Sequence, residues 1–249
     1  MVYQFYLDAA ESAPPPPAEQ SAALPVYVQV SELLIRDIAA GRLMDGARLP
    51  PERTMAADHG IAVGTLRKAL AILEGKGLLE RVQGSGNYVR YNARVDSIYA
   101  MFRLELPGGG GLPRAEVIDT ARQDKGADLP PFGTAKTATR IRRRRYLNDT
   151  LVALEEIWLD GAAGTVDAKA LSESLYQHYR KALGFTISKA EDRVSVAPVP
   201  PWSEGHFTRT PGEMVGLVER LAWADSPAPV EFSRTWFDPD RAHYVQRLR

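Results

Sequence analysis

The sequence of 249 residues predicts an α+β protein with two domains. In residues 25–74, apolar side chains recur at helical spacing, and a short hairpin pattern follows them. Residues 137–160 and 214–238 each alternate as two consecutive strands, which is typical of an antiparallel sheet with helices on one side. The chain is also long for one small domain, so two domains are expected.

Composition indicates an ordinary globular protein, with 45% hydrophobic and 25% charged residues. The formal net charge is zero; residues 25–91 hold nine basic and seven acidic side chains, a balance of +2. Charge alone therefore gives little evidence for a nucleic-acid partner. The chain has no cysteine, which leaves no disulfide, thiolate nucleophile or Cys-type zinc site and fits a cytoplasmic location. We find neither a secretion signal nor an 18-residue apolar run, so no membrane association is expected.

The first 91 residues divide into a tail and a helical domain. Residues 1–24 contain four consecutive prolines and predict a disordered tail. A first helix is expected over residues 26–41, where Gly41 is placed to end it. Pro50 and Pro51 stand where only the start of a helix tolerates proline, so a second helix should occupy residues 52–59, with Gly60 as its stop.

A longer helix and a hairpin complete the predicted N-terminal domain of residues 25–91. Leu66, Leu70 and Leu73 recur at helical spacing and predict a buried seam on a helix over residues 63–74. Residues 78–91 then alternate as two strands around a Gly-Ser-Gly tip.

The remaining chain predicts a linker and a mixed α/β domain. Residues 92–98 are expected to be the linker, and residues 99–249 the second domain. The expected elements are strands over 115–122, 137–146, 150–160, 186–198, 214–224 and 228–238, a short helix or loop over 129–135, a helix over 171–183, a helical turn over 202–207 and a closing segment over 243–248.

Two motifs carry a resemblance to a known family. LPPERTMAADHGIAVGTLRKALAILEGKGLLERVQGSGNYV resembles the winged helix-turn-helix DNA-binding domain of GntR-type bacterial transcription regulators. VALEEIWL at 152–159, ESLYQHY at 173–179 and PVEFSRTWF at 229–237 are similar to the effector-binding (UTRA) domain of the HutC subfamily. The resemblance implies a chorismate-lyase-like second domain, binding to double-stranded operator DNA, a small-molecule effector and a homodimer.

The predicted DNA contacts lie on the second and third helices and at the hairpin tip. A recognition helix needs small or polar residues where it meets base edges, with basic residues beside them for phosphates. Surface charge on a small helical domain is the alternative for any one of these residues, whereas the ordered set favours DNA binding. The candidates are Arg53, Val63, Gly64, Thr65, Arg67, Lys68, Gln83, Gly84, Ser85 and Gly86.

Three positions depart from the family pattern. Ala62 and Val63 stand where relatives carry a serine and an arginine, and Pro51 replaces a helix-capping hydroxyl. Loss of such a cap costs about 1 kcal/mol of stability. Val63 cannot make a bidentate contact to a base, so we expect an operator different from the common one, read partly through a thymine methyl group against Val63.

The predicted effector site centres on two arginines of one strand. Arg143 and Arg145 share a face because alternate strand residues point the same way, and paired guanidiniums suit bidentate binding of an anion. The resemblance implies Glu155, Ser174 and Tyr176 as further contacts. Glu231 is another candidate. The alternative is an exposed arginine edge that pairs with acids across the hairpin.

Two other classes of protein were weighed. A chorismate-lyase-like enzyme is disfavoured: the four histidines lack metal-ligand spacing, and no nucleophile or phosphate-loop motif is present. We therefore expect no catalytic residue, cofactor or metal. A constitutive DNA-binding protein whose second domain only dimerises stays open. The favoured interpretation is a cytoplasmic, ligand-responsive transcription regulator, with repression as the expected mode and an anionic metabolite as the effector.

Overall fold

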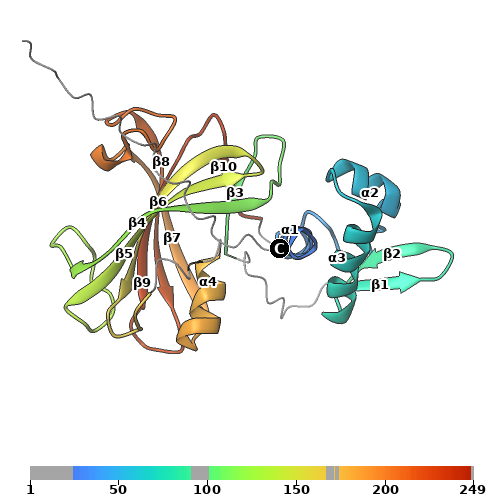
Figure 1. Ribbon diagram of the computed structural model, residues 1–249, viewed down its shortest axis with the longest axis horizontal. Helices are drawn as coiled ribbons and strands as arrows, with labels where there is room; N and C mark the ends of the chain where they lie inside the picture. The colour runs from blue at the N-terminus through green and yellow to red at the C-terminus, as the bar shows by residue number, and fades with distance from the viewer. Residues whose placement is uncertain (1–24, 91–100, 167–170, 172–173, 248–249) are drawn as a thin grey trace, which may run out of the picture.

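The computed structural model describes residues 25–90, 101–166, 171 and 174–247 (Figure 1). The predicted tail of residues 1–24 and the predicted linker of residues 92–98 lie outside these ranges. Within them, no helix is both long and apolar enough to cross a membrane.

The N-terminal region folds into three helices and a hairpin that extends away from the rest of the chain (Figure 1). Its elements are α1 (Val26–Ala39), α2 (Glu52–Asp58), α3 (Val63–Gly75), β1 (Leu79–Val82) and β2 (Gly86–Val89). The predicted leucine seam of α3 is fully buried against α1, because Leu66, Leu70 and Leu73 each have no exposed surface. These elements confirm the winged helix-turn-helix arrangement.

The ends of these helices follow the expected local chemistry. Gly41 and Gly60 both adopt positive φ angles, of 74° and 62°, just after α1 and α2. At the opposite ends, Pro51 and Ala62 precede α2 and α3 without a side-chain hydrogen bond to the first turn. The missing hydroxyl caps predicted from the sequence are therefore missing in the fold as well.

The C-terminal region is built on one six-stranded antiparallel sheet with the strand order β4-β5-β6-β9-β8-β7. A separate ladder pairs β3 with β10. The strands are β3 (Leu104–Glu105), β4 (Pro113–Asp124), β5 (Thr137–Leu147), β6 (Thr150–Asp160), β7 (Lys189–Pro198), β8 (Met214–Trp223), β9 (Glu231–Phe237) and β10 (His243–Tyr244). Both predicted hairpins, β5–β6 and β8–β9, are present, and the α+β class is confirmed.

Apolar layers cover the two faces of this sheet. Helix α4 (Leu175–His178) and the π-helix η2 (Tyr179–Leu183) pack on one face, where Tyr179 is fully buried against Ile141 and Ile157. Trp202, from the 3₁₀ turn η3 (Pro201–Ser203), packs on the other face. Alternation along each strand therefore places one set of side chains under α4 and the next set under η3.

Several elements differ from the expectations. The predicted helix over 171–183 is only a four-residue α-helix, capped by Ser174 and continued by a π-helix. The strand expected from 186 begins at Lys189, whereas residues 129–135 form a loop, which is one of the two predicted alternatives. The expected turn over 202–207 is a 3₁₀ turn at Pro201–Ser203. The β3–β10 ladder has two residue pairs, which is too short to produce an alternation pattern in sequence.

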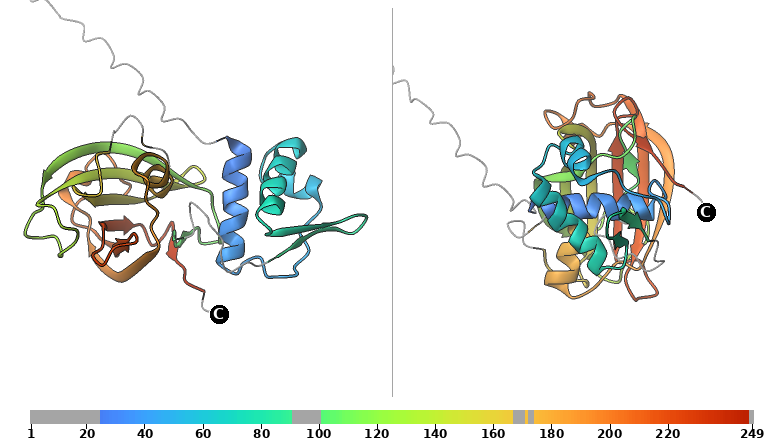
Figure 2. Two further views of the ribbon diagram at one scale, coloured as in Figure 1. Left: turned by 90° about the horizontal axis from the view of Figure 1, so that it is seen from below. Right: turned by 90° about the vertical axis from the view of Figure 1, so that its right-hand side faces the viewer.

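Helix α1 lies between the two halves of the protein, as the left view of Figure 2 shows. Val30, Leu34, Ile35 and Ile38 are buried in the helical core. Arg36 is buried too, and it bonds to backbone carbonyls of the sheet domain instead. One helix thus belongs to the core of the first domain and to its contact with the second.

Candidate functional site

The predicted DNA-contact residues lie on α2, α3 and the hairpin. Arg53, Gly64, Arg67 and Lys68 are exposed, and Thr65 is half-buried. The Arg67 Nε donates to Glu52 Oε2 at 2.6 Å, so α3 is tied to the first turn of α2. DNA binding by Arg67 would therefore compete with this exposed ion pair.

The hairpin tip has the backbone geometry that its glycines permit. Gly84 and Gly86 have φ angles of 74° and 126°, a region that residues with a Cβ seldom adopt. The Ser85 hydroxyl lies 2.6 Å from the Tyr88 hydroxyl, and Gln83 is exposed beside it. The exposed Arg48 side chain lies against Gly86 and was not predicted; its position follows from the bridge between Arg48 and Tyr88. The sequence held no pattern that placed it there.

A cavity opens on the α4 face of the sheet and is hereafter the central cavity. It encloses about 730 Å³ of space between atoms, part of it open to solvent. Residues from β5, β6, α4, β8 and β9 line it, together with the segment 101–104. All six predicted effector-site residues are in this lining: Arg143, Arg145, Glu155, Ser174, Tyr176 and Glu231.

Arg143 and Arg145 share one carboxylate at the base of the cavity. Arg143 Nη2 donates to Glu155 Oε2 at 2.6 Å, and Arg145 Nε lies 3.5 Å from Glu155 Oε1. Burial opposes ionisation of Glu155, but the two guanidiniums outweigh it and lower the pKa of that carboxyl. On the other face of β5, Arg142 pairs with Glu156 instead. The cross-hairpin pairing weighed as an alternative therefore exists, but it is buried in the cavity wall and leaves no exposed arginine edge.

Glu231 lies at the α4 side of the cavity and is almost fully buried. Burial raises the pKa of Glu231 to about 7, partly offset by the hydrogen bond from the Tyr179 hydroxyl to Glu231 Oε2 at 2.6 Å and by Arg143. The Tyr176 hydroxyl contacts Glu231 Oε1 at 3.4 Å. This carboxyl is therefore partly protonated near neutral pH and can donate as well as accept a hydrogen bond.

Ser174 has a structural role in addition to its place in the lining. Its hydroxyl accepts from the Gln177 backbone N–H at 3.3 Å and so caps α4.

Sequence reasoning missed Arg103, Arg220 and Tyr244 in the lining. Arg220 Nε and Nη2 both bond to the Asp192 carboxylate, at 2.5 and 2.6 Å, and the Tyr244 hydroxyl donates to the same group at 2.7 Å. Arg220 lies two residues from Val218, which also lines the cavity, on a predicted strand. The alternation of side chains along that strand could have predicted Arg220. Arg103 and Tyr244 lie beside or in strands of two residues, which are too short to show an alternation.

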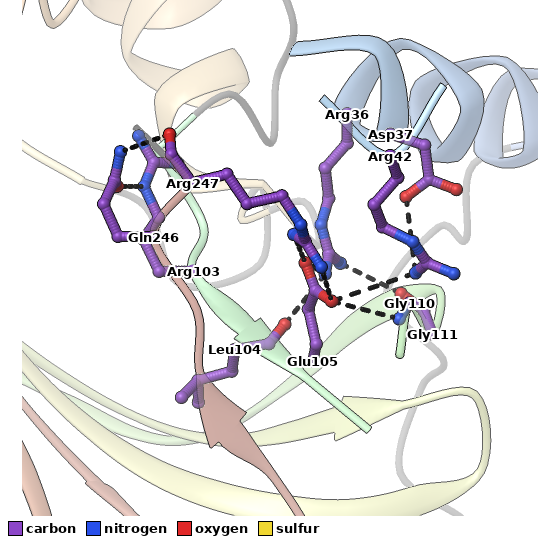
Figure 3. Close-up of polar contacts among 10 residues, drawn as sticks. All are labelled: Arg36, Asp37, Arg42, Arg103, Leu104, Glu105, Gly110, Gly111, Gln246 and Arg247. Atoms are coloured by element: carbon purple, nitrogen blue, oxygen red, sulfur yellow. Dashed lines mark hydrogen bonds and ion pairs between the residues drawn. The ribbon is translucent and has the colours of Figure 1, made fainter. Parts of the chain in front are cut away.

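A polar cluster joins α1 to the sheet domain (Figure 3). At its centre, the buried Glu105 carboxylate accepts from Arg247 Nη1 and Nη2 at 2.6 and 3.0 Å. Arg36 donates to the carbonyls of Leu104 and Gly111 at 2.9 and 3.0 Å. We call this group, with Asp37 and Arg42, the Glu105 cluster. Its carbonyl acceptors and salt bridges connect α1 directly to the segment that leads into the central cavity.

One aromatic ring connects the central cavity to the Glu105 cluster. Phe102 lines the cavity, and the Arg145 guanidinium lies 4.5 Å from its ring centre. The Arg36 guanidinium of α1 lies 5.4 Å from the same centre. Arg145 of the cavity wall and Arg36 of the DNA-binding domain therefore lie near the same aromatic ring.

A winged helix-turn-helix joined to a domain with a polar cavity defines a ligand-responsive, DNA-binding transcription regulator. Two family descriptions match this chain, "Bacterial regulatory proteins, gntR family" over residues 26–89 and "UTRA domain" over residues 110–243. The chain belongs to the GntR family of bacterial regulators, in the group that carries a UTRA domain. It is accordingly a regulator rather than an enzyme.

Known relatives extend over nearly the whole chain. The HTH-type transcriptional regulator SmoD of Agrobacterium fabrum is 55% identical over 91% of this chain and 97% of its own. The HTH-type transcriptional repressor NagR of Bacillus subtilis is 26% identical over 90% of this chain and 96% of its own. The structure of the transcriptional regulator YydK of Bacillus subtilis superposes with a TM-score of 0.51 at 19% identity, covering 91% of this chain and all of YydK, and supports the fold alone.

Proposed function

We propose that this regulator is a repressor that acts in the cytoplasm as a homodimer, and that a small anionic effector in the central cavity lowers its operator affinity. The supporting observation is Arg143. Its side chain is buried in the cavity wall, and its Nε and Nη1 atoms have no hydrogen-bond partner within the described ranges. Buried guanidinium donors are costly unless they are satisfied, so an anion beside them would be bound strongly.

The charge of the lining favours an anion with a polar body. Four arginines line the cavity against two glutamates, and Glu231 is partly neutral near pH 7. The hydroxyl groups of the lining can bind hydroxyl or amino groups of the same ligand; they belong to Ser174, Tyr176, Ser233, Thr235 and Tyr244. The preferred ligand class is therefore a small, hydroxylated or aminated carboxylate, phosphate or related acid.

The route from ligand to DNA runs through the domain contact. An anion bound to Arg145 competes with the Phe102 ring for the same guanidinium, and Phe102 also contacts Arg36 of α1. Because α1 packs against the recognition helix α3, and Leu34 and Leu70 belong to the same core, a shift of α1 would move the DNA-binding surface. A ligand changes operator affinity only if it binds better to one placement of the DNA-binding domains (the heads) than to another. The contact between Phe102, Arg145 and Arg36 would differ between two such placements.

Repression and two-fold binding rest on comparison and symmetry. NagR is a repressor, and it is similar to this chain over both domains. Winged helix-turn-helix proteins commonly bind paired half-sites, so a dimer with one head per half-site fits a two-fold symmetric operator. Operator DNA, the effector and a second copy of the chain are thus the proposed partners.

The test uses the arginine pair and its shared carboxylate together. Replacing Arg143 and Arg145 alone would leave Glu155 buried and unpaired, so the variant R143A/R145A/E155Q removes the charges as a set. A thermal-shift screen of phosphosugars, amino acids and organic acids first identifies an effector. The variant should bind operator normally in fluorescence anisotropy, but its effector affinity should fall about a hundredfold or more.

The matched control is Arg144→Ala, on the same strand but the other face, where Arg144 pairs with Glu116 at 3.1 Å. It should keep the full effector response. A normal response in the triple variant would refute the assignment of the cavity. If no anion shifts the melting temperature or the operator affinity of the unmodified protein, the constitutive alternative would be supported instead.

A further inference from the structure

A second, smaller cavity lies between α1 and the sheet domain, beside the Glu105 cluster. It encloses about 370 Å³ of space between atoms, part of it open to solvent, which is about half the space of the central cavity. Helix α1 and the residue after it contribute Arg36 and two alanines to its lining. The segments around β3 and β10 contribute the rest. We call this space the junction cavity, and Figure 3 shows its charged residues.

Positive charge exceeds negative charge in this lining. Among its described residues, three are arginines and one is an acid: Arg36, Arg103, Arg247 and Glu105. The Glu105 carboxylate is already shared, because it accepts two hydrogen bonds from Arg247 and also lies 4.0 Å from Arg36 and 3.9 Å from Arg42. The lining therefore has an excess of two cations over its single carboxylate.

Two of these arginines are poorly compensated where they lie. Burial lowers the pKa of Arg36, although Glu105 is near it. Burial also lowers the pKa of Arg103, and repulsion from Arg220 adds to this effect. Both changes are those of a cation that has lost hydration without a full replacement. An anion in the junction cavity would supply that replacement.

The arginines also have donors to offer from both domains. A guanidinium has five N–H groups. Arg36 uses two of them on the carbonyls of Leu104 and Gly111, and Arg247 uses two on Glu105. Each of these two side chains thus retains N–H capacity, one on the side of α1 and one on the side of the sheet domain.

We propose that the junction cavity binds a small tetrahedral dianion such as inorganic phosphate, which joins Arg36 of the DNA-binding domain to Arg103 and Arg247 of the sheet domain. This site is distinct from the effector site in the central cavity, and it does not rest on the proposed function. Because the anion would contact both domains, it would stabilise the placement of the domains that the structure shows.

The remaining lining favours a free ion over a larger phosphorylated molecule. Ala39, Ala40 and Val245 offer no polar group, and the Gln246 side chain accepts a hydrogen bond from Arg103 at 2.7 Å. The hydroxyl groups of a sugar phosphate would lose water here without gaining partners, which is unfavourable. The central cavity differs, since several hydroxyl side chains line it.

Isothermal titration calorimetry with inorganic phosphate, at constant pH and ionic strength, tests the site. The central cavity could also bind phosphate, so the protein titrated is R143A/R145A/E155Q, which lacks the arginine pair of that cavity. We expect one phosphate to bind per chain. Adding Ala40→Glu places a carboxylate in the junction cavity and should weaken phosphate binding about tenfold or more.

The matched control is Ala71→Glu, which makes the same change at an exposed alanine of α3 outside the lining. It should leave phosphate binding unchanged. Arg247→Gln removes one proposed contact and should weaken binding about three- to tenfold. Circular dichroism confirms that each variant folds. If R143A/R145A/E155Q does not fold, the same substitutions are compared in the otherwise unmodified protein.

Absence of saturable phosphate binding would overturn the site, and so would equal binding with and without Ala40→Glu. Equal losses in Ala40→Glu and Ala71→Glu would show a general effect of charge and would overturn it as well. Glucose 6-phosphate should bind about tenfold more weakly than phosphate. Equal or tighter binding would overturn the assignment to a free ion. No effector is used, so a failure here is distinguishable from a failure of the proposed function.

Discussion

The Arg145 guanidinium lies 4.5 Å from the ring centre of Phe102. Arg145 belongs to the cavity wall. Phe102 also contacts Arg36 of α1, which is part of the Glu105 cluster. One aromatic ring between two cations therefore connects the wall of the central cavity to the DNA-binding domain. Since cations attract the ring face, an anion that draws one guanidinium away changes the position that the ring prefers.

The variant Phe102→Leu should weaken the coupling between effector and operator. Leucine fills most of the space but has no aromatic face for Arg145 and Arg36. We expect effector and operator each to bind, while the effect of one on the affinity for the other falls about three- to tenfold. Fluorescence anisotropy with and without effector measures both quantities.

Trp202→Leu is the matched control for Phe102→Leu. The Arg142 guanidinium lies 4.4 Å from the Trp202 ring centre, a similar contact on the opposite face of the sheet. It should leave the coupling unchanged. Equal coupling in all three proteins would show that the ring contact does not transmit the signal.

The raised pKa of Glu231 predicts a specific pH dependence of stability. A carboxyl whose pKa is about 7 in the folded protein, against 4.5 ordinarily, binds its proton more tightly when folded. Its contribution to the free energy of unfolding is fully present below pH 4.5 and is lost as the pH rises through 7. The loss is on the order of 3 kcal/mol.

Glu231→Gln keeps the shape but does not titrate, so it should lack this dependence. Urea unfolding of both proteins at pH 5 and pH 8 gives the comparison. The unmodified protein should lose stability relative to the variant between these pH values. If the two proteins differ in free energy of unfolding by the same amount at pH 5 and pH 8, Glu231 has the same charge at both pH values.

The ion pair between Arg67 and Glu52 predicts a gain in DNA binding when it is removed. Glu52→Gln releases the Arg67 guanidinium, which no longer has to leave a carboxylate to reach a phosphate. Exposed pairs of this kind contribute up to about 1 kcal/mol, so affinity for a selected operator should rise about two- to fivefold. The slope of log affinity against log salt concentration should become steeper by about 0.9, the value for one additional phosphate contact.

Glu74→Gln provides the comparison for this effect. Glu74 pairs with Arg81 near the other end of α3, at 3.7 Å, and its change should leave affinity and salt slope as they were. An unchanged salt slope in Glu52→Gln would indicate that Arg67 does not contact the DNA backbone.

The sequence predicted most of the helical domain because its signals are local. The Leu66–Leu70–Leu73 seam, the stops at Gly41 and Gly60 and the glycine turn at residues 84–86 each act over a few residues. Arg143 and Arg145 could be placed on one face for the same reason, since strand alternation is a local rule.

The parts that were not predicted depend on long-range contacts. Glu105 meets Arg247 across 142 positions, and Arg220 reaches Asp192 through the pairing of β8 with β7. In the Gly108–Gly111 run, Gly110 and Gly111 supply backbone groups to the domain contact. Such pairings carry no periodicity and become visible only when the strand order is known.

The position of α1 limits how this protein can exchange parts with its relatives. Helix α1 provides part of the helical core and also the arginine that bonds to Leu104 and Gly111. A domain boundary placed after the β1–β2 hairpin therefore separates Arg36 from the residues that it contacts. A chimera that joins this DNA-binding head to a foreign sensor would retain Arg36 without its acceptors. Functional hybrids should therefore need the Leu104–Gly111 loop and Arg247 to be inherited together with the head.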